Sequence, residues 1–118
     1  MVNHLTHYMI NVKNVHRSVK FYSEKLGFKI EYETSEWAEL KTENGMELAL
    51  KKQFKGDPVG SGGLGFVVND CRKATDILKN RGVKILKDCE LREKGSKYLT
   101  QFNDQDGDVI WMVEKSKK

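Results

Sequence analysis

Few residues in this sequence have the types and spacing that a reaction requires. Cys71 directly follows Asp70 at the predicted start of a helix, where the helix dipole favours the reactive thiolate form. No histidine lies beside it in the sequence, so we favour a half-buried structural thiol over a nucleophile. A G-x-S-x-G motif is absent. The GSGGLG run at 60–65 precedes a predicted strand, whereas a dinucleotide-binding glycine motif opens a helix.

The acidic run DQDGD at 104–108 is typical of a turn between two strands. A calcium-binding loop needs a glutamate at a fixed distance after such a run, and none is found there. Asp57 stands beside the only proline and is interpreted in the same way. We therefore predict turns at both places, and neither calcium binding nor carboxylate catalysis.

Cys71 belongs to a segment that occurs twice. Residues 7–27 read HYMINVKNVHRSVKFYSEKLG, and residues 63–82 read GLGFVVNDCRKATDILKNRG. In each copy an alternating apolar strand leads into Asn14 or Asp70, which can cap a helix, and a glycine ends that helix. One module is therefore used twice.

Each module is predicted to contain a strand, a helix and three further strands. The expected strands are 7–12, 28–32, 38–40, 46–51, 64–68, 83–87, 97–102 and 109–113. Asn44-Gly45 is a hairpin signal between the third and fourth of these. The apolar stripes of the two helices are expected at Val15, Val19, Tyr22 and Leu26, and at Ala74, Ile77 and Leu78.

The length predicts one domain of 1–118, and the strand and helix patterns predict that it is α+β, with modules at 1–53 and 63–118 joined by a linker at 54–62. Apolar residues make up 38% and charged residues 32%, which is ordinary for a soluble globular protein. The net charge of +4 is spread among interleaved acids and bases, so no nucleic-acid groove is predicted. No apolar run has membrane-spanning length and no signal peptide is recognised, so we expect a cytoplasmic protein with reduced cysteines.

Several motifs together resemble the vicinal oxygen chelate superfamily, which includes glyoxalase I, extradiol dioxygenases, fosfomycin resistance enzymes and bleomycin resistance proteins. The matching segments are His7 with Val12, RSVKFYSEKLGF at 17–28, GMELAL at 45–50, GSGGLGFVVND at 60–70 and FNDQDGDVI at 102–110. They cover nearly the whole chain in the family's order. The resemblance implies two βαβββ modules whose curved mixed sheets form a cup for metal and substrate, with the helices outside.

The resemblance also locates the family's metal ligands, one on the first and last strand of each module. In this sequence those places hold His7, Glu47, Gly63 and Trp111. A glycine has no side chain and an indole nitrogen is only a donor, so two of the four positions cannot bind a metal. Unless His4, Glu39 or a partner chain compensates, the metal site is incomplete, and we predict no metal cofactor.

Strand alternation then predicts which side chains line the cup. If His7 and Glu47 face it, the same side of the other strands carries Met9, Asn11, Trp37, Glu39, Ala49, Leu99, Gln101, Val109, Trp111 and Val113. Two tryptophans with a few polar groups are typical of a site for a flat organic ligand. We predict that His7, Trp37, Glu39, Glu47, Gln101 and Trp111 bind a small planar or aromatic molecule, as in bleomycin resistance proteins.

Other interpretations remain open. The main alternative is a metal-dependent enzyme, lactoylglutathione lyase-like or dioxygenase-like, with a metal site rebuilt around His7 and Glu47; a structural protein with a vestigial cup is a third. His7 is otherwise a structural histidine, Glu47 a solvated strand residue and Trp111 part of a dimer interface. We assign His4 and His16 to the surface. Because the family's modules often pair across chains, a homodimer is also expected.

Overall fold

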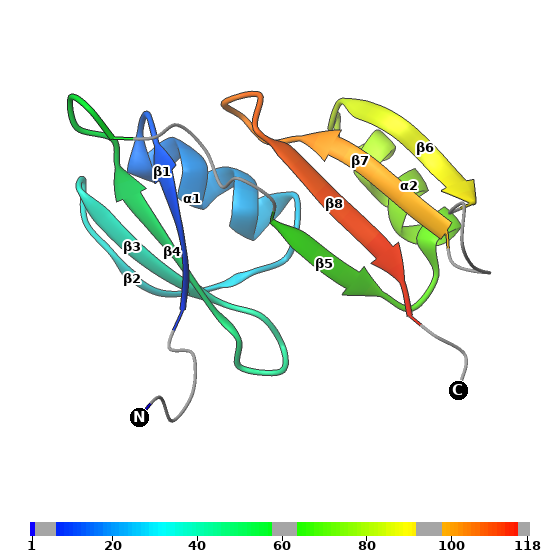
Figure 1. Ribbon diagram of the computed structural model, residues 1–118, viewed down its shortest axis with the longest axis horizontal. Coiled ribbons are helices and arrows are strands. Elements are labelled where there is room, and N and C mark those ends of the chain that lie inside the picture. The colour runs from blue at the N-terminus through cyan, green and yellow to red at the C-terminus, as the bar shows by residue number, and fades with distance from the viewer. Residues whose placement is uncertain (2–6, 58–63, 92–97, 116–118) are drawn as a thin grey trace. The chain divides into compact units, whose positions relative to one another are not determined.

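The computed structural model divides the chain into two compact units, Met1–Ser61 and Gly62–Lys118. It describes residues 1, 7–57, 64–91 and 98–115. Both units contain the same order of elements (Figure 1). The linker predicted at 54–62 lies partly outside the described residues; its described part contains a turn in which the Asp57 amide donates to the Phe54 carbonyl at 3.0 Å.

The first unit is a four-stranded mixed sheet with one helix against it. Its elements are β1 (Tyr8–Val12), α1 (Val15–Glu24), β2 (Lys29–Glu33), β3 (Trp37–Lys41) and β4 (Glu47–Lys52). The strand order is β1-β4-β3-β2, with β1 parallel to β4 and the other pairs antiparallel. The predicted hairpin between β3 and β4 is present, and Gly45 has a φ of +85°, which glycine adopts easily.

The second unit repeats this topology. Its elements are β5 (Gly65–Val68), α2 (Cys71–Asn80), β6 (Ile85–Leu91), β7 (Tyr98–Asn103) and β8 (Val109–Glu114). The strand order is β5-β8-β7-β6, again with one parallel pair, β5 and β8. The predicted α+β fold of two βαβββ modules is confirmed.

Both helices begin at the residues that the sequence predicts. The Asn14 side chain accepts the Arg17 amide at 2.9 Å, and the Asp70 side chain accepts the Lys73 amide at 3.0 Å. Each satisfies one of the amides that the first turn of a helix leaves without an internal partner. The caps therefore fix where the chain turns from β1 into α1 and from β5 into α2.

Each helix packs on one face of its sheet, and the core lies between them. The buried residues of the first unit include Ile10, Val12, Val15, Val19, Tyr22, Ala38, Leu40, Leu48 and Leu50; those of the second include Cys71, Thr75, Leu78, Thr100, Phe102, Ile110 and Met112. We call the other side of each sheet its helix-free face. Residues on a strand alternate between the two faces, so burial of one set determines which set is left on the helix-free face.

Four expectations about burial need correction. Ile77 is 40% exposed and Ala74 is only half-buried, because the buried stripe of α2 runs through Cys71, Thr75 and Leu78. Thr75 is accommodated in the core because its hydroxyl lies 2.6 Å from the Thr100 hydroxyl. Cys71 is fully buried rather than half-buried, since it faces this same pair. Leu26 is half-exposed because α1 ends at Glu24.

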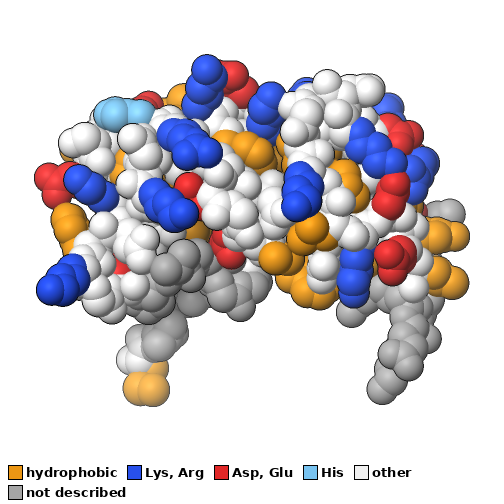
Figure 2. Space-filling model, turned by 90° about the horizontal axis from the view of Figure 1, so that it is seen from above, with side chains coloured by type: hydrophobic (Ala, Val, Ile, Leu, Met, Phe, Trp, Pro, Cys, Tyr) orange, Lys and Arg blue, Asp and Glu red, His pale blue; other side chains and the backbone are white. Residues whose placement is uncertain are grey.

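The surface carries mixed charges, as the sequence predicts. On the face shown in Figure 2, Lys and Arg side chains are scattered among acidic and apolar ones. Within the described residues, no helix combines the length and apolar character that crossing a membrane requires.

Candidate functional site

The helix-free face of the first unit carries four of the six predicted site residues: His7, Trp37, Glu39 and Glu47. On β3, Ala38 and Leu40 are buried toward α1, so Trp37 and Glu39 point the other way. The same alternation places Glu47 on this face, because Leu48 and Leu50 of β4 are buried. The predicted strand parity is therefore observed in this unit.

Trp37 is the centre of a small cluster on this face. Its indole N–H donates to Glu39 Oε2 at 2.9 Å. The His7 ring lies edge-on to it, with ring centroids 6.0 Å apart and an interplanar angle of 88°. This is a favourable aromatic geometry, and the carboxylate fixes the orientation of the indole. His7, Trp37 and Glu39 are thus brought together.

Glu47 lies at the far end of the β3–β4 pair from Trp37. Lys41 is its cross-strand neighbour, whereas Trp37 stands opposite Lys51. Glu47 does lie near the start of β1, because Tyr8 pairs with Leu48 and His7 and Glu47 immediately precede that pair. His7 and Glu47 therefore lie on neighbouring strands at this end of the sheet.

A lysine-centred ion pair that the sequence analysis missed lies at the other end of the same face. Lys51 Nζ is 2.5 Å from Asp57 Oδ2, 3.5 Å from Asn11 Oδ1 and 4.8 Å from the centre of the Phe54 ring. Two hydrogen bonds hold the pKa of Asp57 below its ordinary value. The larger cause is the bond from Lys51, and the second is the bond from the Phe54 backbone N–H at 3.0 Å. The turn at 54–57 therefore supplies a carboxylate to the β4 lysine, which no local sequence pattern indicates.

The helix-free face of the second unit has a comparable row of side chains. Trp111 of β8 pairs with Gly65 of β5 on one side and with Gln101 of β7 on the other. Lys87 of β6 is the next neighbour of Gln101, and its Nζ lies 6.0 Å from the centre of the Trp111 ring. Gln101 and Trp111 are thus brought together as predicted, and Lys87 is an additional cation beside the indole.

The described residues do not fit a metal centre. Among residues 7–57, 64–91 and 98–115, no three His, Cys, Asp or Glu side chains lie close enough together to hold an ion. Trp111 presents an indole, which has no lone pair for a metal, and Glu39 is hydrogen-bonded to Trp37. Gly63 and His4 lie outside the described residues. That all six predicted residues line one cup stays a prediction.

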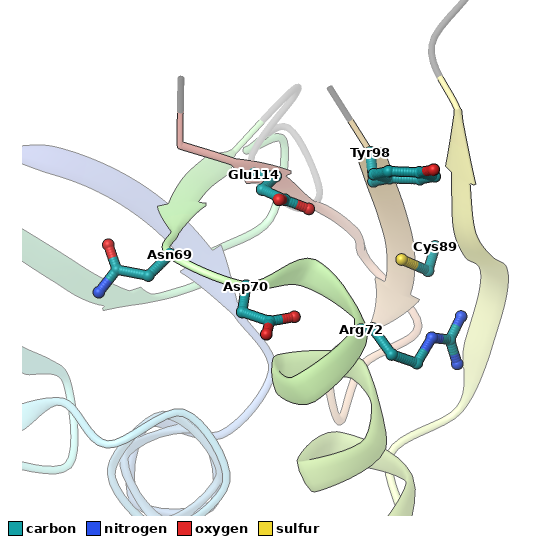
Figure 3. Close-up of a pocket in the computed structure, with 6 residues that line it drawn as sticks. All are labelled: Asn69, Asp70, Arg72, Cys89, Tyr98 and Glu114. Atoms are coloured by element: carbon teal, nitrogen blue, oxygen red, sulfur yellow. The ribbon is translucent and has the colours of Figure 1, made fainter. Parts of the chain in front are cut away.

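A cavity lies on the other side of the second sheet, where the N-terminal end of α2 meets it. It measures about 520 Å³ and is lined by Asn69, Asp70, Arg72, Cys89, Tyr98 and Glu114 (Figure 3). Glu114 Oε2 accepts the Cys71 amide at 3.4 Å, and the Asp70 carboxylate caps the helix. Strand alternation alone does not predict this site, because a bulge in β6 positions Cys89.

Comparison with protein-family models identifies one family. A family model described as the glyoxalase/bleomycin resistance protein/dioxygenase superfamily matches residues 4–112. No curated protein sequence matches the chain.

Solved structures are similar over nearly the full length. A member of the same superfamily from Sphaerobacter thermophilus has a TM-score of 0.85 and 21% identity, covering 97% of this chain and 98% of that one. TnmS3, an antibiotic binding protein from Streptomyces sp. CB03234, has a TM-score of 0.83 and 23% identity, covering 98% of each chain. A protein from the mobile metagenome of V. pseudocholerae has a TM-score of 0.77 and 25% identity, covering 99% of this chain and 98% of that one.

The Lys51–Asp57 pair predicts a specific pH dependence of stability. The pKa of Asp57 is lowered from its ordinary 3.8, so the ionised carboxyl stabilises the folded state above that pH. This contribution is lost as the pH falls through the lower, folded-state pKa. We expect Asp57→Asn to reduce the free energy of unfolding near neutral pH, and this effect should diminish as the pH falls below 3.8. Urea unfolding of both proteins across this range measures the difference.

The matched control is the same substitution in a Lys51→Met background. There the main cause of the lowered pKa is gone, so the effect of Asp57→Asn should depend much less on pH. An Asp57→Asn effect that is constant between neutral and acid pH in the wild-type background would contradict this account.

Proposed function

The chain belongs to the glyoxalase/bleomycin resistance protein/dioxygenase superfamily, and from this premise we propose that it binds a small planar or aromatic molecule without a metal ion. The observation that carries the proposal is that each unit presents one tryptophan, flanked by polar side chains, on the face that its helix leaves open. TnmS3, whose fold is similar, is an antibiotic binding protein. The proposed binding residues are His7, Trp37, Glu39, Glu47, Gln101 and Trp111.

In the first unit, the contacts of Trp37 support a role in stacking. The indole is half-buried and is held by Glu39 and by the edge of His7. A side chain that is already oriented loses little conformational entropy when a flat molecule stacks on it. Glu39 and Glu47 would supply the few polar contacts that orient a ligand in an otherwise apolar site.

In the second unit, the neighbours of Trp111 support the same role. Gly65, opposite it on β5, has no side chain to cover the indole. Gln101 offers both a donor and an acceptor, and Lys87 places a cation near the ring. A ligand here would gain from apolar burial, at about 25 cal/mol per Å², and from stacking, at about 0.5–1.5 kcal/mol per aromatic pair. Binding of this kind needs no bond to be made or broken.

The second candidate is a metal-dependent enzyme of the glyoxalase or dioxygenase type. The observation in its favour is the proximity of His7 and Glu47 at the start of β1 and β4. Two protein donors leave a divalent ion short of the three that a catalytic site ordinarily has. A third donor would have to come from His4, from a partner chain, or from Glu39 after it gives up its hydrogen bond with Trp37.

Metal analysis distinguishes the two candidates. We expect protein purified without chelators to contain far less than one equivalent of zinc, nickel, manganese or iron, because Trp111 occupies a position where the family has a ligand. Elemental analysis by mass spectrometry measures this. About one tightly held ion per chain, lost on His7→Ala or Glu47→Gln, would favour the enzyme instead.

We also propose that the protein is a cytoplasmic homodimer. In each unit an edge strand carries exposed apolar side chains, including Tyr32 at 53% on β2 and Leu91 at 60% on β6. Such an edge offers unpaired backbone groups and apolar surface to a second copy. Light scattering at micromolar concentration should give twice the mass of one chain, and the mass of one chain would count against the dimer. The two free cysteines fit a reducing compartment.

The tryptophans provide the direct test of binding. In a fluorescence screen of aromatic antibiotics and metabolites, we expect at least one compound to quench the indoles. Trp37→Ala and Trp111→Ala should each weaken its binding by roughly two- to tenfold, the equivalent of about 0.5–1.5 kcal/mol. Both residues are only half-buried, so stability should change much less than for Phe102→Ala in the core, where a loss of about 3–5 kcal/mol is expected.

Tyr98→Ala is the matched control for loss of an aromatic ring. Tyr98 lies on the α2 side of the second sheet and should not affect this binding. A Trp111→Ala protein that is strongly destabilised, together with no quenching of the wild type by any compound, would show that the tryptophan is structural and that the proposal is wrong.

A further inference from the structure

A bulge in β6 determines where Cys89 points. Lys87 pairs with Gln101 and Glu90 with Leu99, so Asp88 and Cys89 both stand opposite Thr100. Two residues against one is the definition of a β-bulge, which changes the direction of side chains. Cys89 has a φ of +49°, a conformation that non-glycine residues adopt rarely. Regular alternation would place Asp88 and Cys89 on opposite faces; the bulge directs both toward α2.

Two cations of α2 hold this bulge. Arg72 Nη2 donates to Asp88 Oδ1 at 2.7 Å, and Lys79 forms an ion pair with the same carboxylate. Both interactions keep the pKa of Asp88 below its ordinary value, with the Lys79 hydrogen bond the larger cause. The Arg72 guanidinium also lies beside the Cys89 thiol (Figure 3), where its charge acts to lower the pKa of that thiol. The helix therefore fixes the position of the thiol and places a positive charge beside it.

Thr100 connects Cys89 to the second cysteine. Its hydroxyl oxygen accepts the Cys89 amide at 3.0 Å and lies 3.3 Å from Cys71 Sγ. Partial burial raises the pKa of the Cys89 thiol, and the adjacent Cys71 thiol raises it further, while Arg72 acts in the opposite direction. The two cysteines thus meet at one hydroxyl, that of Thr100, although 18 positions separate them in the sequence (71 and 89).

The two thiols differ in access. Cys71 is fully buried, whereas Cys89 is half-buried and lines the cavity at the start of α2. Figure 3 shows the Cys89 sulfur between Tyr98 and Arg72, pointing into the space that the six lining residues enclose. A cavity of about 520 Å³ is within the size range of small-molecule sites. A small reagent can therefore reach Cys89 but not Cys71.

We propose that Cys89 and Cys71 form a reactive thiol pair that is oxidised by a small-molecule disulfide entering this cavity. Cys89 loses its proton to solvent, and its thiolate attacks one sulfur of the reagent, which breaks the reagent's S–S bond and releases one thiolate. Cys71 then loses its proton and attacks Cys89 Sγ in the mixed disulfide, which releases the second thiolate. Both released thiolates take up protons. In total, two protein thiols are oxidised to one disulfide, and one reagent disulfide is reduced to two thiols.

Each structural feature has a defined part in this sequence of steps. The accessible Cys89 makes the first attack, and the Arg72 guanidinium favours its thiolate form. The buried Cys71 cannot meet the reagent, but it lies next to the mixed disulfide and resolves it. The bulge residues Asp88 and Cys89 are held to α2 by Arg72, so loss of that guanidinium affects both the position and the charge state of Cys89.

The test uses oxidised glutathione and intact-protein mass spectrometry on the folded chain. We expect the wild-type protein to lose the mass of two hydrogen atoms without keeping an adduct, and a thiol reductant to reverse the change. Cys71→Ala should stop at one glutathione adduct per chain, located on Cys89 by peptide mapping. Cys89→Ser should remain unmodified, because Cys71 is buried. Thermal unfolding of each variant confirms that it is folded under the conditions of the assay.

Arg72→Gln tests whether Arg72 positions Cys89. This substitution should slow disulfide formation, whereas Arg81→Gln, at the other end of α2, should leave the rate unchanged. If the folded wild-type protein keeps both thiols, retains a glutathione adduct that is not resolved, or forms only disulfides between chains, the proposal is overturned. Modification of Cys71 in folded Cys89→Ser would also overturn it, since the order of attack depends on the burial of Cys71.

Discussion

The structure depends on one constraint, which is that each sheet is covered by a helix on one face only. The sequence alternates along β3 and β4 so that Ala38, Leu40 and Leu50 are fully buried beneath α1. Tyr22 of α1 is also fully buried, and its ring packs edge-on against Phe28 at 5.8 Å. A fully buried leucine such as Leu40 or Leu50 contributes roughly 1.5–3 kcal/mol by leaving water. Because a strand has two faces, this burial leaves the other face of the sheet free to carry polar and aromatic side chains.

Much of the fold could be predicted from the sequence because its signals are local. Asn14 and Asp70 mark helix starts by a hydrogen bond that spans only three residues, and both act as caps in the structure. The faces of Trp37 and Gln101 follow from period-two alternation beside buried Ala38 and Phe102. The helix starts and the strand faces can therefore be predicted from residues that are close in the sequence.

The features that escaped prediction depend on residues that are distant in sequence. The exposure of Ile77 was not predicted because Thr75 takes the buried position on α2, where Thr100 of β7 satisfies its hydroxyl. The pairing of Lys51 with Asp57 depends on how the turn folds back onto β4. Cys89 was not considered as a site because alternation cannot locate a bulge, and this bulge is stabilised by Arg72 and Lys79 from a different element.

In the proposed binding mode, a tryptophan would recognise a molecule in a different way from a metal ion. A metal ion binds oxygen donors strongly at fixed distances and can polarise them for reaction. An indole provides a broad apolar surface that favours flat shape and tolerates different substituents, because every aromatic ring presents a similar face. Under this proposal, specificity would come from the polar neighbours, Glu39 beside Trp37 and Gln101 beside Trp111, which a mismatched ligand would leave unsatisfied. A few positions on the helix-free face would then decide whether the module holds a metal ion or a flat molecule, because the core under the helix does not depend on those positions.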